Sequence, residues 1–587
     1  MPTAEQSSSE SAGRGRSWAW PGLTIVLAGG LGLRLWGVGQ GLPYAFNSDE
    51  ADHFVPRAIK MFEAGSLNPH YFANPPAFTY LLHYLFLAWY GGSSGAVAAL
   101  KLHPTDVYTL ARVAAAVLGT AALWLLYTTG ARLFGRGVGL LAAAIEAVAF
   151  LPVFYAHLAL NDVPTLAPLT LSLLGTAGVL GKGRKRDYLL AGLGLGLACA
   201  SKYTAGIVIL PLLAAVTVRF LERGSGSARR ILVGLALAGL AGLVAFLLAN
   251  PYALLDYTSF HGELVHQSTL SAEAQGKLGA PKQGGLLYYL WSLIWGLGWV
   301  PAVFALGGAL SIWRSHPRLG WLLVPAPLLF LAFMGLQGRY FGRWLLPVFP
   351  VLCLLAAFFA VSLVGAAKSW SKQRGGSPLL GGALGALLVA ALLLQGTIYS
   401  VHSGLVLSRA DTRNLTREWM LAHIPPGSPI VVEPVSPNEW ANQTHPGTST
   451  AANHQQWNKY PSLLSRISAT GALRPTTTKI GIENYVRTLA PALLGYYEAH
   501  GFCWVISGST QSGRAYADPR AVPLAIAYYR ALARRGEVVY RSSPYGAGKR
   551  PVAFDFDWSF DYYPLAYRRP GPEMTIYRLH GGRCAGA

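Results

Sequence analysis

The chain has 587 residues, of which 52% are hydrophobic and only 12% are charged, and its mean hydropathy is +0.35. A soluble protein carries roughly twice this charged fraction, so the composition excludes an ordinary soluble enzyme. The formal net charge of +21 could suggest a nucleic-acid-binding protein. Many of the basic residues, however, lie in short loops between apolar segments, where the positive-inside rule explains them, and we expect no nucleic-acid partner.

The chain begins with a polar stretch that is followed by an apolar one. Residues 1–17 are rich in serine, carry Arg14 and Arg16, and are predicted to be a cytoplasmic tail. The apolar segment 18–38 has no convincing small-residue cleavage site. We therefore interpret it as a retained first span and not as a signal peptide.

Apolar segments of about 20 residues, the length that crosses a bilayer as a helix, recur as far as residue 401. They predict a polytopic α-helical membrane protein of about 11 transmembrane helices. The predicted spans are 18–38, 107–129, 138–158, 163–181, 188–201, 203–219, 231–250, 286–312, 320–336, 345–366 and 379–401.

The loops between these spans predict the orientation of the chain. The apolar, aromatic segment 77–90 is too short to span and is predicted to be a helix at the membrane interface. If it does not cross, basic loops alternate regularly with loops that hold most of the acids. The basic loops, which we place on the cytoplasmic side, are 131–137, 181–187, 219–230, 313–319 and 368–376.

The segment between Asp187 and Arg219 is too short for two ordinary spans and a turn. Two short helices that meet at Ser201-Lys202-Tyr203 would still cross twice, and they would hold Lys202 below the outer surface. A lysine held there needs an anionic partner or a water-filled cavity. The alternative is a lysine that snorkels to the outer interface.

The first outer loop, 39–106, opens with three acids in four residues, Asp49, Glu50 and Asp52. Acids beside a membrane span are costly to place in lipid, so they should face water or line a polar cavity. His70 and Tyr71 in the same loop have side chains that can bind phosphate, sugar or metal. A divalent metal is thus left open, and the alternative is a solvated loop whose acids only cap helices.

Three further polar residues lie at outer ends of predicted spans. Asp162 precedes Val-Pro, where a helix N-cap is the alternative to a binding role. Arg339 and Arg343 lie at the outer mouth of the span that begins at residue 345. Arginine binds phosphate through two hydrogen bonds, although interfacial anchoring is the alternative for both residues.

The composition changes after Val401, since residues 402–587 are polar and contain no spanning segment. Short apolar strands and helices predict a separate, extracytoplasmic, soluble α/β domain. Cys503 and Cys584 could form a disulfide there, although no spacing pattern supports it. The predicted organisation is therefore a tail (1–17), a transmembrane catalytic domain (18–401) and the C-terminal domain (402–587).

Several motifs occur in an order that resembles a known superfamily. They are SDEADHF, NPPAFTYLLHYLF, ARVAAAVLGTAALWLLYTTGARLFG, the Asn-Asp pair at 161–162, LGLACASKYTAGIVILPLL, NPYALLDYTSF, RYFGRWLLPVFP and DTRNLTREWMLAHIPPGSPIV. The set covers most of residues 18–435 and resembles the GT-C glycosyltransferases. Within them it is most similar to bacterial and archaeal relatives of the dolichyl-phosphate-mannose protein mannosyltransferases and of the aminoarabinose lipid A transferase. Two departures are His53, where relatives commonly have an aromatic residue, and the part beyond about residue 436, which matches no family pattern.

The resemblance implies an enzyme that uses a polyprenyl-phosphate sugar, inverts the anomeric centre and has Asp49 as its general base. The chemistry fits, because an attacking hydroxyl needs a base and the departing phosphate needs cationic stabilisation. The remaining candidate substrate-binding residues are Glu50, His70, Tyr71, Asp162, Lys202, Arg339 and Arg343.

We therefore predict an inverting glycosyltransferase of the plasma membrane, with mannose as a candidate sugar and a hydroxyl on a protein, lipid or glycan as acceptor. One alternative is a polytopic transporter or flippase for lipid or sugar. Transporters often show two matching hydropathy halves with interrupted helices, whereas this chain shows one broken pair and no matching half. Another alternative is a non-catalytic membrane anchor that presents residues 402–587 to a partner.

Overall fold

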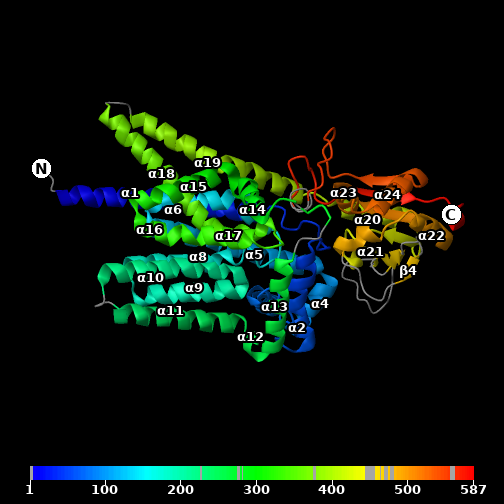
Figure 1. Cartoon of the computed structure of the whole chain (residues 1–587), viewed down its shortest axis with the longest axis horizontal. Helices are drawn as coiled ribbons and strands as arrows, with labels where there is room; N and C mark the ends of the chain where they lie inside the picture. Colours follow the sequence, from blue (N-terminus) through cyan, green and yellow to red (C-terminus); the bar gives the residue numbers. More distant parts are fainter. Residues whose placement is uncertain are drawn as a thin grey trace.

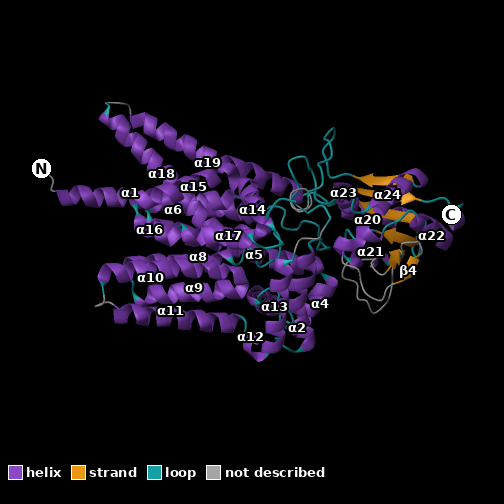
Figure 2. Ribbon diagram, in the orientation of Figure 1, coloured by secondary structure: helices purple, strands orange, loops and turns teal. Residues whose placement is uncertain are grey.

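The computed structural model describes residues 4–224, 228–273, 278–280, 282–374, 378–442, 456–462, 465–467, 473–475, 482–555 and 562–586. A bundle of long helices occupies one end of the molecule, and a smaller part containing all the drawn strands occupies the other (Figures 1 and 2). We refer to elements α20 to η8 as the C-terminal domain.

Apolar helices build the bundle, and several short ones lead directly into longer ones. They are α1 (Ala4–Leu35), α5 (Pro104–Leu133), α6 (Arg136–Val148), α7 (Phe150–Tyr155), α8 (Leu166–Gly181), α9 (Lys185–Ser201), η2 (Tyr203–Val208), α10 (Ile209–Arg223), α11 (Ala228–Ala249), α14 (Gly285–Leu293), η4 (Ile294–Gly298), α15 (Trp299–Ser315), α16 (Pro317–Leu323), α17 (Pro325–Gly335), η5 (Gly342–Val348), α18 (Phe349–Gln373) and α19 (Pro378–Leu407). Every predicted span falls on one or more of these helices, and α1 also covers most of the predicted tail.

Within the described ranges, 7 helical stretches are long and apolar enough to cross a membrane. Shorter apolar helices occupy Ala19–Leu35, Ala77–Trp89 and Leu166–Gly181. The prediction of a polytopic α-helical membrane protein with a sheet-containing C-terminal domain is therefore confirmed. The count of eleven transmembrane helices stays a prediction.

The predicted break in the short helix pair is confirmed. Helix α9 ends at Ser201, Lys202 has an extended backbone (φ −156°, ψ 120°), and η2 begins at Tyr203. Glycines hold α9 tightly in place, because a Cβ added at Gly192 would lie 2.0 Å from a backbone oxygen of α11. Small residues of this kind allow close helix packing in membranes. The packing thus fixes helix α9, which leads into Lys202.

Short helices gather at the end of the bundle that adjoins the C-terminal domain (Figure 1). They are η1 (Glu50–Phe54), α2 (Val55–Ala64), α3 (Ala77–Trp89), α4 (Ser93–Leu102), α12 (Tyr252–Leu255) and α13 (Tyr257–Ala272). Helix α3 is the predicted interfacial helix; its 13 residues extend about 20 Å, short of the roughly 30 Å of a hydrocarbon core. The end of α10 and the start of α11 lie at the opposite end of the bundle, as do the end of α18 and the start of α19 (Figure 1).

The C-terminal domain is built on a five-stranded sheet of order β2-β1-β5-β7-β6, beside a two-stranded sheet of β3 and β4. Strands β2, β1 and β5 are parallel, whereas β7 is antiparallel to both β5 and β6. The strands are β1 (Pro429–Val432), β2 (Asn458–Lys459), β3 (Ser465–Ile467), β4 (Leu473–Pro475), β5 (Trp504–Gly508), β6 (Glu537–Ser542) and β7 (Met574–Arg578). The helices are α20 (Thr412–His423), α21 (Asn438–Asn442), η7 (Ile482–Thr488), α22 (Ala492–His500), α23 (Ser509–Ala517), α24 (Pro523–Arg535) and η8 (Gly582–Cys584).

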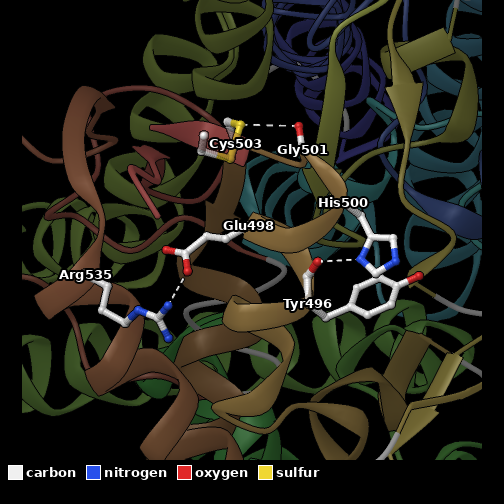
Figure 3. Close-up of a disulfide and its surroundings, with 7 residues drawn as sticks. Tyr496, Glu498, His500, Gly501, Cys503 and Arg535 are labelled. Carbon is white, nitrogen blue, oxygen red and sulfur yellow. Dashed lines mark hydrogen bonds and ion pairs between the residues drawn. A yellow bond between two sulfur atoms is a disulfide. The ribbon is translucent and has the colours of Figure 1, made fainter. Parts of the chain in front are cut away.

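A disulfide joins Cys503, next to β5, to Cys584 in η8 (Figure 3). The pairing that the sequence only allowed is thus present, and it closes a loop with a sequence separation of 81 residues. Nearby, the guanidinium of Arg535 on α24 pairs with the carboxylate of Glu498 on α22 (Figure 3). A crosslink over so long a loop typically stabilises a fold by a few kcal/mol.

Candidate functional site

Four charged residues from four distant parts of the chain meet at the end of the bundle. The Nη2 atom of Arg343 donates to Oδ2 of Asp49 at 2.8 Å, and its Nε lies 3.8 Å from Oδ2 of Asp162. The ammonium of Lys202 pairs with Oδ1 of the same Asp162. Asp49, Arg343, Asp162 and Lys202 therefore form a row of alternating charges, which we call the charge cluster.

The charge cluster is buried at one end and open at the other. The side chain of Asp162 is 4% exposed and that of Lys202 12%, whereas the side chain of Asp49 is 33% exposed. Charges shielded from water interact more strongly than charges at a surface. The cluster thus offers an accessible carboxylate beside cations that the protein holds in place.

The loop before Asp49 positions its backbone. Oδ1 of Asn47 accepts hydrogen bonds from the backbone N–H groups of Asp49, at 3.0 Å, and Glu50, at 3.2 Å. An asparagine in this role satisfies donors that the first turn of a helix leaves unpaired. Asn47 therefore fixes the backbone from which the Asp49 side chain extends.

Glu50 lies apart from the charge cluster, although it adjoins Asp49 in sequence. Its carboxylate is fully buried and receives Nε and Nη2 of Arg112 at 2.7 and 2.8 Å. It also accepts the backbone N–H of Ala159 at 2.8 Å. These bonds tie η1 to α5 and to the turn before α8. The prediction that Glu50 binds substrate stays untested, and its contacts are those of a residue that locks the loop in place.

The turn that carries Asp162 is tied to the end of α9. Nδ2 of Asn161 donates to the carbonyl oxygen of Ser201 at 2.5 Å. Asp162 does not cap helix α8, whose N-cap is Thr165, so the helix-capping alternative is wrong. Instead Asp162 accepts Lys202, which therefore has the anionic partner that a buried lysine requires.

Arg343 points into the bundle end at the start of η5. Its guanidinium lies 4.7 Å from the centre of the Phe341 ring and 5.9 Å from that of Tyr155. Aromatic faces attract cations, so both rings favour this placement. The other candidate arginine, Arg339, lies outside the cluster, with its Nη2 3.6 Å from the carboxylate of Glu273 at the end of α13.

His70 and Tyr71 lie in the first loop, also outside the charge cluster. His70 is exposed, and its carbonyl oxygen accepts Nη1 of Arg57 at 2.9 Å. The ring of Tyr71 stacks on that of His53 at 4.4 Å, and burial raises the pKa of the Tyr71 hydroxyl above its ordinary value. Burial also lowers the pKa of His53, an effect that Asp49 opposes. His53 thus packs through the face of its ring against Tyr71.

Residues that were not predicted from sequence hold the loop around Tyr71. The carboxylate of Glu263 on α13 accepts the backbone N–H groups of Phe72 and Ala73. The hydroxyl of Tyr203 donates to the carbonyl oxygen of Phe72 at 2.9 Å. Tyr203 follows Lys202 directly, so the loop and the charge cluster share one support. The sequence signal for Glu263 is weak, because acids are common in exposed loops.

The site contains acids, but the described residues do not form a cluster of side chains that resembles a metal centre. No three His, Cys, Asp or Glu side chains among them gather closely enough to hold an ion. Asp49 and Asp162 both face cations of the protein itself. The residues of the cluster that the structure describes are thus arranged as ion pairs.

Comparison with known proteins gives a match over part of the chain. Residues 100–253 match the family model described as dolichyl-phosphate-mannose-protein mannosyltransferase. A search among curated proteins gives no match. The matched segment contains Asp162 and Lys202 of the charge cluster, together with Arg112, which pairs with Glu50.

Two solved structures are distantly similar to most of the chain. One is the archaeal oligosaccharyltransferase AglB from Archaeoglobus fulgidus, in complex with an inhibitory peptide and a dolichol-phosphate (13% identity, 90% of this chain, 73% of that chain, TM-score 0.49). The other is ArnT from Cupriavidus metallidurans bound to undecaprenyl phosphate (14% identity, 97% of this chain, 99% of that chain, TM-score 0.46). The match over residues 100–253 agrees with the resemblance that the motifs predict to the dolichyl-phosphate-mannose protein mannosyltransferases and their relatives.

Proposed function

We propose that the chain is an inverting glycosyltransferase, a hexosyl or pentosyl transferase that moves one sugar from a polyprenyl-phosphate donor to a hydroxyl acceptor. Mannose is the candidate sugar, which the description of the matched family model supports. The observation that carries the proposal is the charge cluster, because its accessible carboxylate pairs with one cation, Arg343, and a second cation, Lys202, lies in the same cluster. Transfer of a sugar from a phosphate needs both kinds of group.

The proposed reaction uses Asp49 as the general base. As the acceptor oxygen attacks the anomeric carbon, Asp49 takes the hydroxyl proton. The new bond forms on the face opposite the phosphate, and the bond from that carbon to the phosphate oxygen breaks. The electron pair of the broken bond stays on the polyprenyl phosphate, so the anomeric configuration is inverted.

The cations of the charge cluster would receive the leaving phosphate. Arg343 presents a planar fork that suits a phosphate, and Lys202 adds a second positive charge. A bound phosphate would compete with Asp49 for Arg343, which leaves the carboxylate free to face the acceptor. Asp162 would keep the two cations in place, since it contacts both.

The other predicted site residues remain proposals with separate roles. His70, Tyr71 and Arg339 lie outside the charge cluster, and we propose that they line the approach of the acceptor, which is a protein, lipid or glycan. Glu50 would act at a distance, since its bonds to Arg112 fix the helix that carries Asp49. The polyprenyl chain of the donor would lie in the bilayer.

We also propose that the site faces the outside of the plasma membrane. Two features support this orientation. The basic loop 219–230, which is predicted to be cytoplasmic, includes the end of α10 and the start of α11, and these lie away from the C-terminal domain (Figure 1). The disulfide between Cys503 and Cys584 is a bond that persists in oxidising compartments. An alkaline phosphatase fusion after Arg409 should therefore be active, and one after Arg184 inactive; the reverse pattern would overturn the orientation.

The experiment that tests the function uses the purified full chain. It is incubated with a panel of radiolabelled polyprenyl-phosphate sugars and a mixture of candidate acceptors, and transfer or slow hydrolysis is measured. We expect turnover of one donor by the wild type and its loss in Asp49→Asn. Movement of labelled donor across a vesicle membrane without cleavage of the sugar–phosphate bond would favour a flippase instead.

A further inference from the structure

The first loop sends an aromatic side chain into the C-terminal domain. Tyr44 is 6% exposed and belongs to the apolar core that Ile430, Val432 and Met574 of the sheet help to form. The guanidinium of Arg417 on α20 lies 5.5 Å from the centre of the Tyr44 ring. The C-terminal domain thus encloses a residue of the membrane bundle's own loop.

Neighbouring residues strengthen this contact. The guanidinium of Arg413 lies 3.5 Å from the centre of the Phe46 ring, and Nδ2 of Asn414 donates to the carbonyl oxygen of Gly41 at 3.0 Å. Both partners come from helix α20. Residue 47, which caps the backbone of Asp49, follows directly. The segment that leads into Asp49 is therefore held by α20.

A second aromatic side chain crosses in the opposite direction. Tyr562, which lies between β6 and β7 in sequence, is 1% exposed and belongs to the core of the bundle. Its hydroxyl lies 2.8 Å from that of Tyr155, and its ring centre lies 4.8 Å from that of Trp295. A Cβ added at Gly342 would lie 3.1 Å from the Tyr562 hydroxyl, so glycine at this position leaves room for the insertion.

The inserted tyrosine reaches Arg343 through one intermediate. Tyr155 bonds to Tyr562 and also lies with its ring 5.9 Å from the guanidinium of Arg343. Gly342, which contacts the insertion, directly precedes Arg343. The two crossings thus end on the two partners of one ion pair, since Tyr44 leads to Asp49 and Tyr562 leads to Arg343.

We infer that the C-terminal domain positions the charge cluster, with Tyr44 setting the place of Asp49 and Tyr562 setting the place of Arg343. The two tyrosines are positioning residues, since neither contacts a reacting group. The domain cannot shift relative to the bundle without withdrawing one ring or the other. A misplacement of about 1 Å at a reacting group can cost roughly 100-fold in rate. The insertion of Tyr44 into the C-terminal domain and of Tyr562 into the bundle therefore controls turnover. The catalytic consequence rests on the proposed function, whereas the positional one does not.

The positional consequence is tested by hydrogen–deuterium exchange of the full chain in detergent. Tyr44→Ala should speed exchange in residues 47–55, and Tyr562→Ala should speed it in residues 338–346, with each change confined to its own segment. The control is Tyr545→Ala, a half-buried tyrosine of the same domain whose ring contacts Tyr567; it should alter neither segment. Unchanged exchange in both segments would overturn the inference, whether or not the protein transfers sugar.

The catalytic consequence is tested by separating donor binding from turnover. Tyr44→Ala should lower kcat by roughly 10- to 100-fold without weakening the Kd for polyprenyl monophosphate, because only the base moves. Tyr562→Ala should weaken that Kd as well, because Arg343 moves. Tyr44→Phe should restore full activity, since the Tyr44 hydroxyl has no hydrogen-bond partner among the described residues.

The outcomes distinguish the two proposals. If the variants change exchange as expected but the wild type transfers no sugar, the proposed function fails and the positional inference stands. If the wild type transfers sugar and both alanine variants keep the wild-type kcat and Kd, the inference is overturned. Tyr155→Phe and Tyr562→Phe should have non-additive effects on the Kd, because each removes the same hydrogen bond; additive effects would show that Tyr562 does not act through Tyr155.

Discussion

Arg343 donates a hydrogen bond to Asp49 at 2.8 Å, although 294 positions separate the two residues in the chain. Arg343 is also 3.8 Å from Asp162, so one guanidinium faces two carboxylates. An arginine shared in this way can exchange one anionic partner for another without becoming unpaired. This property is what a site for a leaving phosphate requires.

Replacing the proposed base should separate chemistry from binding. Asp49→Asn keeps the shape of the side chain but removes its capacity to accept the proton, so turnover should fall about 10²- to 10⁴-fold. Binding of polyprenyl monophosphate should not weaken, because Arg343 remains and the anion that competes for it is gone. The initial rate and the Kd are measured on the same preparation, with Asp52→Asn as the exposed neighbouring control. Near-normal turnover in Asp49→Asn would mean that another group accepts the proton.

The geometry of Arg343 should matter as well as its charge. Arg343→Lys keeps the charge but loses the fork that binds two oxygens at once. A lost charge-assisted hydrogen bond contributes on the order of 1.5–3 kcal/mol, so donor binding should weaken roughly tenfold or more. Arg339→Ala should have a smaller effect, since Arg339 faces Glu273 and lies outside the cluster. Equal effects at the two positions would contradict this placement of the phosphate.

The pair of Glu50 and Arg112 should behave as a structural lock. Both side chains are fully buried, and removing one partner of such a pair typically costs 3–5 kcal/mol. Arg112→Met should therefore lower the thermal midpoint of the full chain strongly, whereas Asp52→Asn, at an exposed position, should change it little. A folded Arg112→Met protein with an unchanged midpoint would contradict the role of this pair as a structural lock.

The C-terminal domain should lose stability as the pH rises. Burial raises the pKa of Glu433 from 4.5 to about 7, an effect that its bonds to Gly508, Tyr529 and Ser507 oppose. A pKa raised on folding means that the contribution to stability is complete below pH 4.5 and declines as the pH approaches and passes 7. The decline should amount to about 3 kcal/mol.

This pH dependence can be measured as protection of strands β1 and β5 against hydrogen exchange, corrected for the intrinsic rate at each pH. Glu433→Gln removes the titrating group and should flatten the profile. The same decline in the variant as in the wild type would assign the pH dependence to other groups.

The sequence predicted those site residues that are polar and stand within or between apolar segments. Lys202 interrupts an apolar run, and Asp162 stands between two apolar segments, so each is conspicuous without any knowledge of the fold. The hydropathy pattern likewise predicted the helix break at Lys202, because too few residues were available for two full spans. Burial of a lone charge in a membrane protein demands a partner, and Asp162 supplies it.

The local sequence pattern could not show that residues that are neighbours in sequence have different partners in the fold. Asp49 and Glu50 are adjacent on one helical turn, so their side chains diverge, and only the position of Arg112 decides which carboxylate is locked. Arg339 and Arg343 are four apart, which on a helix would place them on one face. The backbone between them is extended at Phe341, however, and they face different partners.

The insertion of Tyr44 into the C-terminal domain and of Tyr562 into the bundle had no sequence signal at all. Single aromatic residues in loops have no periodicity, and their partners lie on elements hundreds of positions away. Such contacts depend on how two separately predicted parts dock, which neither hydropathy nor charge patterning encodes.

Strand β7 follows the other strands of its sheet in sequence, yet it lies between β5 and β6. The sheet therefore cannot close until residues 574–578 have been synthesised and have joined it, and Tyr562 lies just before them. A nascent chain that already has its whole helical bundle in the bilayer would still lack the support for Arg343. Under the proposed function and orientation, the charge cluster would thus gain its full support only after the C-terminal domain has been exported, and a half-made protein would transfer no sugar.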